Sequence, residues 1–268
     1  MELPVRRWTF ALTMLAALLF QGCARPRVSP DAEFQRTSEE YLKGHLAWRP
    51  ASGMALGLHE YDGRITDFSR ASLDAELRRL KQFDARLARL SPKNFTREAA
   101  FDYRLLQANI RAEIFGFEQV ESFTRNPMTY AQAIDLTQYV KRDFAPLSNR
   151  VYSIVAIEKQ TPALFTAARM NLRPGLPKPF IETAIDVAEG QMAFLEKDLP
   201  LAVKEVNDSG LLKEFNAANR IALTELSNFV AWLKSERLPQ ADNSFALGRE
   251  KYREMMRLSE FVELTPQQ

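Results

Sequence analysis

The sequence predicts an all-α protein, a bundle-like array of several helices with no significant β-sheet, and three observations support this fold class. Apolar residues recur at spacings of three and four almost throughout the chain after residue 31, which gives a helix one apolar face. Only 10 of the 268 residues are glycine, whereas the good helix formers Ala, Leu, Glu and Arg are abundant. No stretch alternates apolar and polar residues convincingly enough to predict a strand.

The longest predicted helices are the five segments that keep the helical rhythm for several turns. They cover residues 34–48, 73–90, 101–115, 181–199 and 212–233. Shorter helices are predicted over 128–137, after the breaker Asn126-Pro127, and over 147–159. Another is predicted to start at Thr161, because threonine is a good N-cap and Pro162 suits the first turn.

The chain divides by composition into a leader, a tether and one helical region. Residues 1–22 are predicted to be a lipoprotein signal peptide, and the polar, proline-bearing residues 23–30 a tether. Residues 31–268 then form the helical region. The run 173–179 is its clearest internal break, but the helical patterns on both sides match. We therefore predict a loop within one domain there.

The N-terminus has the layout of an export signal. Arg6 and Arg7 precede the uncharged, mostly apolar run 8–20. Thirteen residues rise only about 20 Å as a helix, which is short of the roughly 30 Å hydrocarbon core of a bilayer. The run ends at Gly22-Cys23 and resembles a bacterial lipobox, in which the cysteine thiol is acylated. We therefore expect Cys23 to be a lipidation site.

Two details of this segment leave an alternative open. Phe20 and Gln21 depart from the usual lipobox residues, and cleavage after Ala24 would give an ordinary secreted or periplasmic protein. If Cys23 is lipidated, its acyl chains anchor the protein by about 0.8 kcal/mol for each buried methylene. The expected location is the periplasmic face of the cell envelope. Because Ala24 stands where inner-membrane lipoproteins often carry aspartate, resemblance favours the outer membrane.

Composition excludes several classes of function. Lys and Arg total 36 against 34 for Asp and Glu, so there is no electrostatic case for nucleic acid as a partner. Cys23 is the only cysteine, so no disulfide can form within the chain. The two histidines, His45 and His59, are too few for a histidine- and cysteine-rich metal site.

Segment 49–68, where the helical rhythm fails, contains the residues that look most reactive. His59-Glu60 begins like the helix of a zinc peptidase, but Gly63 stands where the second histidine ligand must fall. We expect a tight turn at Asp62-Gly63 instead, with His59 hydrogen-bonded to a nearby backbone or carboxylate group.

The other histidine, His45, shares a helical stripe with Tyr41 and Trp48, which is typical of a satisfied core or boundary residue. There is no nucleophile elbow, phosphate-binding glycine loop or dinucleotide fingerprint. We therefore assign no catalytic residue and no metal ligand.

Four groups of residues carry a family resemblance. They are 50–64 with 67–69, 102–106 with 126–130, 161–165 with 168–172, and 245–252. In this order they resemble the N-terminal half of the DUF885 family, bacterial proteins of unassigned function related to zincin-type metallopeptidases. Gly57, His59, Asp62 and Gly63 match the family's opening turn, whose role is unknown.

The resemblance implies a mostly helical, exported or lipid-anchored protein and zinc-dependent peptidase activity. In the family the His-Glu-x-x-His motif lies in the downstream half, and the present 268 residues contain no such motif. We therefore expect the N-terminal helical portion of such a protein, with a zinc cofactor only where the C-terminal half is present. The alternative is a stand-alone, non-catalytic helical lipoprotein that binds a peptide or protein partner.

Overall fold

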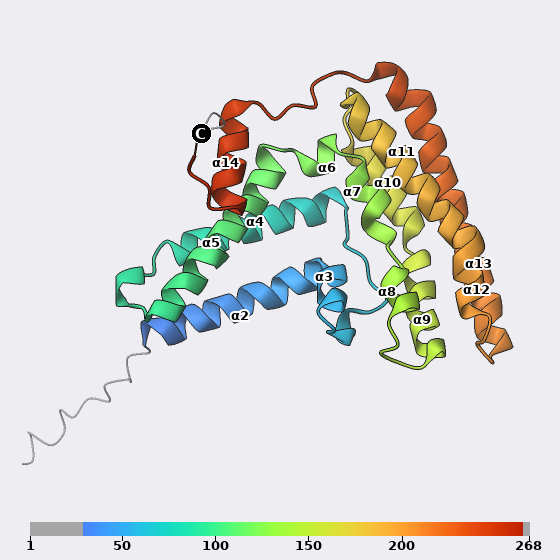
Figure 1. The fold of residues 1–268 in the computed structure, drawn as a ribbon, viewed down its shortest axis with the longest axis horizontal. Coiled ribbons are helices and arrows are strands. Elements are labelled where there is room, and N and C mark those ends of the chain that lie inside the picture. Colours follow the sequence, from blue (N-terminus) through green and yellow to red (C-terminus); the bar gives the residue numbers. More distant parts are fainter. Residues whose placement is uncertain (1–28, 265–268) are drawn as a thin grey trace, which may run out of the picture.

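The computed structural model describes residues 29–264, and in these residues it confirms the all-α prediction (Figure 1). The described residues form no sheet, and an isolated bridge joins Pro177 to Asp242. The helices are α2 (Pro30–Trp48), α3 (Pro50–Ala55), α4 (Arg70–Leu87), α5 (Arg97–Glu118), α6 (Ser122–Arg125), α7 (Met128–Ala131), α8 (Thr137–Lys141), α9 (Leu147–Glu158), α10 (Thr161–Asn171), α11 (Lys178–Ala193), α12 (Leu199–Val203), α13 (Ser209–Trp232) and α14 (Arg249–Ser259).

The longest helices begin where a side-chain oxygen can accept from the first free backbone N–H groups. Four N-cap residues accept in this way from the N–H group three positions on: Ser29, Ser69, Thr96 and Asp208.

The first group of helices comprises α2, α4 and α5 (Figure 1). Contacts of Glu40 with Arg86 and of Trp48 with Ser72 show that α4 runs antiparallel to α2. The group has its own buried core, in which Phe34 and Tyr103 meet edge to face at 5.9 Å. Its other buried apolar members are Tyr41, Leu80, Phe83, Leu87 and Ile110.

The second group contains the larger core. α13 packs against α9, α10 and α11, and the rings of Phe165 and Phe229 lie 4.8 Å apart between α10 and α13. Residues 172–177, between α10 and α11, are not helical, and Leu176 in this stretch is fully buried.

The last helix, α14, returns to the first group and packs against α5 (Figure 1). Lys251 Nζ donates to the backbone oxygen of Gln119 at 3.0 Å, just beyond the end of α5. The first group is therefore built from two parts of the chain that are far apart in the sequence.

The predicted helix over 128–137 is broken. α7 ends at Ala131, a 3₁₀ turn follows over Gln132–Ile134, and α8 begins at Thr137. Asp135 Oδ1 accepts from the backbone N–H and the hydroxyl of Thr137 at 2.9 and 2.6 Å. An aspartate that bonds the backbone two residues ahead competes with the helical pattern, which explains the interruption.

Candidate functional site

In the turn at 57–63, His59 lies against a nearby carboxylate, as predicted. His59 Nδ1 lies 3.1 Å from Asp62 Oδ2, and the His59 ring stacks on Phe144 with centroids 4.1 Å apart. Gly57 and Gly63 have φ of +82° and +73°, a region that other residues rarely adopt. The His59 side chain is therefore fixed between a carboxylate and an aromatic ring.

Gly63 also fastens this turn to the second group of helices. Its N–H donates to Tyr139 Oη at 3.1 Å, and its carbonyl accepts from Gln160 Nε2 at 2.9 Å. A Cβ at position 63 would lie 3.2 Å from Ala156 Cβ. The absence of a side chain lets the backbone approach α9 closely, which explains structurally why position 63 is a glycine.

A second junction centres on Asn171 at the end of α10. Its Nδ2 donates to the backbone oxygen of Phe68 at 2.8 Å and lies 3.1 Å from Tyr130 Oη. Tyr130 in turn donates to the backbone oxygen of Phe123 at 2.6 Å, and its ring lies 5.2 Å from that of Phe68. Burial raises the pKa of Tyr130 to about 12, so the phenol is neutral and can donate. These bonds join the loop before α4 to α7 and α10.

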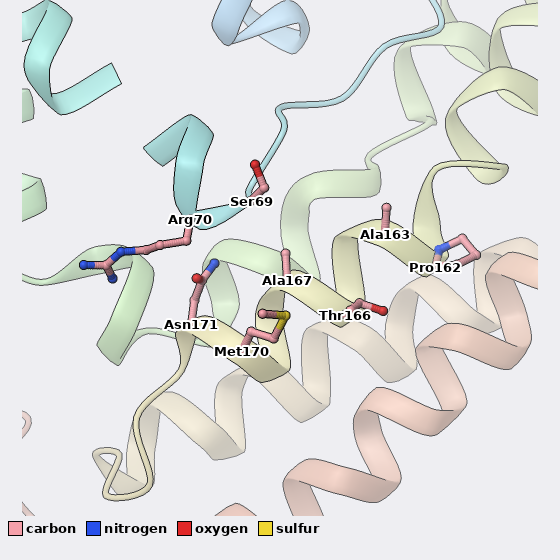
Figure 2. Close-up of a pocket in the computed structure, with 8 residues that line it drawn as sticks. All are labelled: Ser69, Arg70, Pro162, Ala163, Thr166, Ala167, Met170 and Asn171. Carbon is pink, nitrogen blue, oxygen red and sulfur yellow. The ribbon is translucent and has the colours of Figure 1, made fainter. Parts of the chain in front are cut away.

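An open pocket of about 650 Å³ lies beside this junction (Figure 2). Ala167 and Met170 on α10 lie across the pocket from Ser69 and Arg70, whose guanidinium extends away from α10. Met170 is 79% exposed. Pro162, Ala163, Thr166 and Asn171 complete the lining. The pocket thus combines an apolar wall with a few hydroxyl, amide and guanidinium groups, which suits a mixed apolar and polar ligand.

The structure brings together residue groups that are separate in the sequence. The pocket and the Asn171 junction contain residues from 67–69, 126–130, 161–165 and 168–172. These are parts of three of the four groups that carry the family resemblance. Sequence reasoning assigned no role to Asn171 or Tyr130, because an isolated polar residue on a helix gives no sign of a distant partner.

A polar cluster lies between α2 and α5. Glu113 accepts from Tyr41 Oη at 2.8 Å and from Arg49 at 2.9 Å, and its carboxylate lies 3.2 Å from His45 Nδ1. Burial alone would raise the pKa of Glu113. The hydrogen bond from His45, the charges of Arg49 and His45 and the bond from Tyr41 outweigh burial and lower this pKa to about 2. Burial and the neighbouring Glu113 raise the pKa of Tyr41, so its hydroxyl stays a donor. The prediction of a satisfied boundary histidine at His45 is confirmed.

A buried carboxyl group lies elsewhere, on α9. Glu158 is 1% exposed, and neither of its oxygens has a hydrogen-bond partner among the described residues. It shares a helical face with Val151, Ile154 and Val155 of the larger core. Burial raises the pKa of Glu158 to about 8, so the group is largely protonated at neutral pH.

The histidines do not form a metal centre. His45 lies against Glu113 and His59 against Asp62, in different places. Within residues 29–264, no three His, Cys, Asp or Glu side chains are grouped so that they could hold a metal ion. The zinc implied by the family resemblance therefore does not fit the side chains of this part of the chain, and we derive no catalytic step from it.

The lipidation site expected at Cys23 lies outside the described residues, as does the predicted signal peptide. In the described part of the chain, no helix has both the length and the apolar character needed to cross a membrane.

The described residues form a helical protein in which residues from three of the groups with the family pattern meet at the pocket and the Asn171 junction. The profile of the bacterial family of unknown function DUF885 matches residues 50–268, and the chain belongs to this family. A comparison with curated proteins finds no significant match.

A solved structure from Shewanella oneidensis, of a protein described as a candidate lipoprotein of unknown function, has a similar fold. The TM-score is 0.77 at 22% sequence identity. The superposition covers 87% of this chain and 43% of that one, so this chain spans less than half the length of its structural relative. At this identity the similarity establishes the fold.

Proposed function

We propose that this chain is the N-terminal helical portion of an exported DUF885-type peptidase and that it forms a wall of the substrate site. The observation that carries the proposal is the pocket of Figure 2 together with the Asn171 junction beside it, where three of the groups with the family pattern meet. The Asn171 bonds to Phe68 and Tyr130 fix the shape of this wall. Zinc-dependent hydrolysis would belong to the part of the family that carries the His-Glu-x-x-His motif.

The pocket has the chemistry of a side-chain subsite for a peptide. Ala163, Ala167 and Met170 offer apolar contact. Ser69 and Arg70 add polar groups at the edge, where the Ser69 hydroxyl bonds Asp67 and Arg70 pairs with Asp74. A smaller cavity of about 250 Å³ shares Ser69, Ala163 and Ala167 with the pocket. The two cavities together form a longer surface along α10, which suits an extended ligand better than a compact one.

The test begins with the genomic DNA, read for a continuing frame with His-Glu-x-x-His. In the longer product we expect Ala163→Trp, which fills the pocket from an exposed position, to raise KM for peptide hydrolysis about tenfold with little change in kcat. Ala217→Trp, on an exposed face of α13, is the matched control and should leave KM unchanged.

Two results would contradict this proposal. One is peptide hydrolysis by the 268-residue chain itself that a chelator abolishes. The other is an unchanged KM in Ala163→Trp.

The second candidate is a non-catalytic helical lipoprotein that binds a peptide or protein partner. It is favoured by the open groove between α2 and α5, whose volume of about 850 Å³ exceeds that of the Figure 2 pocket. A stop codon directly after Gln268, together with saturable peptide binding by the purified chain, would favour this candidate over the first.

We also propose that Cys23 anchors the protein to the periplasmic face of the envelope. The export-signal layout and the single cysteine support this, as does the description of the Shewanella oneidensis protein as a candidate lipoprotein. Cys23→Ser should move the protein from the membrane fraction to the soluble fraction. Unchanged membrane attachment would overturn the anchor, and equal recovery in the inner-membrane fraction would overturn the outer-membrane location.

A further inference from the structure

The groove between α2 and α5 is a concave surface of the first helical group with a volume of about 850 Å³. Its walls come from α2, α3, Thr96 and the N-terminal part of α5, and none of its lining residues comes from α4. The apolar floor is made by Phe34, Leu42, Leu46, Leu56, Leu105 and Leu106. α4 completes the core of this group without covering the groove.

Several leucines of this floor are open to solvent. Leu42 is 49% exposed, Leu105 56% and Leu56 71%, and they come from α2, α5 and the turn directly after α3. Single exposed leucines are ordinary, but leucines that gather in one groove mark a surface suited to an apolar partner.

The shape of the groove fits a helix. Asp31 bonds Thr96 at one end and Arg49 bonds Glu113 near the other, so α2 and α5 run parallel with a fixed separation. The lining positions of α2 extend from Asp31 to Leu46, which corresponds to about 22 Å, or about four helical turns. A helix in this groove would pack against both α2 and α5, as neighbouring helices of a bundle do. An extended peptide would find no strand edge here for its backbone groups.

The charges of the rim determine which helix would fit. Glu98 and Asp102 lie one turn apart on α5, both are exposed, and neither forms an ion pair with another described residue. Asp31 adds a carboxylate at the same end, and no lysine or arginine lines the groove. The rim is therefore acidic and complements a basic partner.

We propose that this groove binds an amphipathic helix whose apolar face is flanked by lysine or arginine. The inference rests on the binding role proposed above as the second candidate. It does not depend on peptidase activity, and the Figure 2 pocket takes no part in it.

The experiment uses the full chain carrying Cys23→Ser, exported and purified without detergent. The probe is a labelled synthetic peptide of about 16 residues, with leucine along one helical face and lysine beside it. A matched peptide has glutamate in place of each lysine. Fluorescence anisotropy is expected to show saturable 1:1 binding of the lysine peptide and at least about tenfold weaker binding of the glutamate peptide.

Variants locate the binding. Leu105→Asp and Leu42→Asp, both at exposed positions, are each expected to weaken binding of the lysine peptide at least about tenfold. Leu201→Asp, at an exposed position of α12, is the control and should bind as the unmodified chain does. Glu98→Lys combined with Asp102→Lys should reverse the preference between the two peptides. Circular dichroism confirms that each variant keeps its helical content.

Three results would overturn the proposal. The first is no saturable binding of the lysine peptide. The second is equal weakening by Leu201→Asp and Leu105→Asp. The third is a dimer in the absence of peptide that Leu105→Asp dissociates, because a second copy of the chain would then occupy the groove. Loss of peptide hydrolysis in a longer gene product, with lysine-peptide binding intact, would count against the peptidase role alone.

Discussion

The side-chain amide of Asn171 donates a hydrogen bond of 2.8 Å to the backbone carbonyl of Phe68, 103 residues earlier in the chain. The bond is buried and joins the end of α10 to the loop that leads into α4. Losing the hydrogen-bond partner of a buried carbonyl costs more free energy than losing a partner at the surface.

Asn171→Ala is expected to lower the free energy of unfolding by about 1–3 kcal/mol, because it leaves the Phe68 carbonyl buried without a donor. Urea denaturation followed by circular dichroism measures the change. Asn207→Ala, at an exposed loop position, is the control and should stay within about 0.5 kcal/mol of the unmodified chain. Equal effects of the two substitutions on the free energy of unfolding would show that the bond from Asn171 to Phe68 does not stabilise the protein measurably.

Gly63→Ala is expected to destabilise the protein by about 1–3 kcal/mol, since alanine is strained at φ +73° and its Cβ would crowd Ala156. Gly57→Ala shares the positive φ but meets nothing within 4 Å, so it should cost less. Gly190→Ala, inside α11 with open space around it, should stabilise by about 0.5–1 kcal/mol. Thermal denaturation should rank the three variants in that order, and a stable Gly63→Ala would contradict the close packing of the turn.

Glu158 should make the protein less stable as the pH rises. The folded state holds this proton up to a pKa of about 8, whereas the unfolded chain releases it near 4.5. Between these values the unfolded state binds fewer protons, so stability falls by up to about 1.4 kcal/mol per pH unit and levels off above about pH 8.

Glu158→Gln, which stays neutral, should remove this part of the pH dependence when urea denaturation is repeated from pH 5 to pH 9. Glu214→Gln is the control, since Glu214 is a half-exposed carboxylate paired with Lys159 next to Glu158. If Glu158→Gln and the unmodified chain lose stability in parallel above pH 5, the carboxyl group is not protonated in the folded protein.

Glu113 should act in the opposite direction at acidic pH. Its pKa of about 2 lies below the ordinary value of 4.5, so it stabilises the protein above pH 4.5 and loses this effect as the pH falls toward 2. Glu113→Gln should lower the free energy of unfolding at pH 6, because an amide cannot accept well from Tyr41, His45 and Arg49 together. It should also reduce the loss of stability between pH 4.5 and pH 2. Glu118→Gln, at an exposed ion pair with Lys81, is the control. If Glu113→Gln loses stability below pH 4.5 as steeply as the unmodified chain, the lowered pKa of Glu113 is refuted.

The sequence allowed the long helices and one local contact to be predicted. The apolar rhythm over 181–199 and 212–233 corresponds to α11 with its continuation into α12 and to α13, because periodicity is a property of neighbouring residues. The contact of His59 with Asp62 was predictable for the same reason, since the two residues are three positions apart.

The residues of the candidate site could not be found in this way. The carboxylate of Glu113 is buried because Tyr41 and His45 lie across from it on α2, about 70 residues earlier. Asn171 likewise depends on Phe68 and Tyr130, and the break in the predicted helix at 128–137 depends on one aspartate that bonds the backbone ahead of it. Such contacts depend on the tertiary fold, and nothing in the local pattern marks them.

The return of α14 to α5 has a consequence for how the protein is made. Lys251 and Gln119 are 132 residues apart, and a ribosome that adds about 5–20 residues per second needs on the order of ten seconds to synthesise the chain between them. During that interval the face of α5 that α14 covers has no partner. The first helical group therefore reaches its final packing only after α14 has been synthesised, although the group begins with α2.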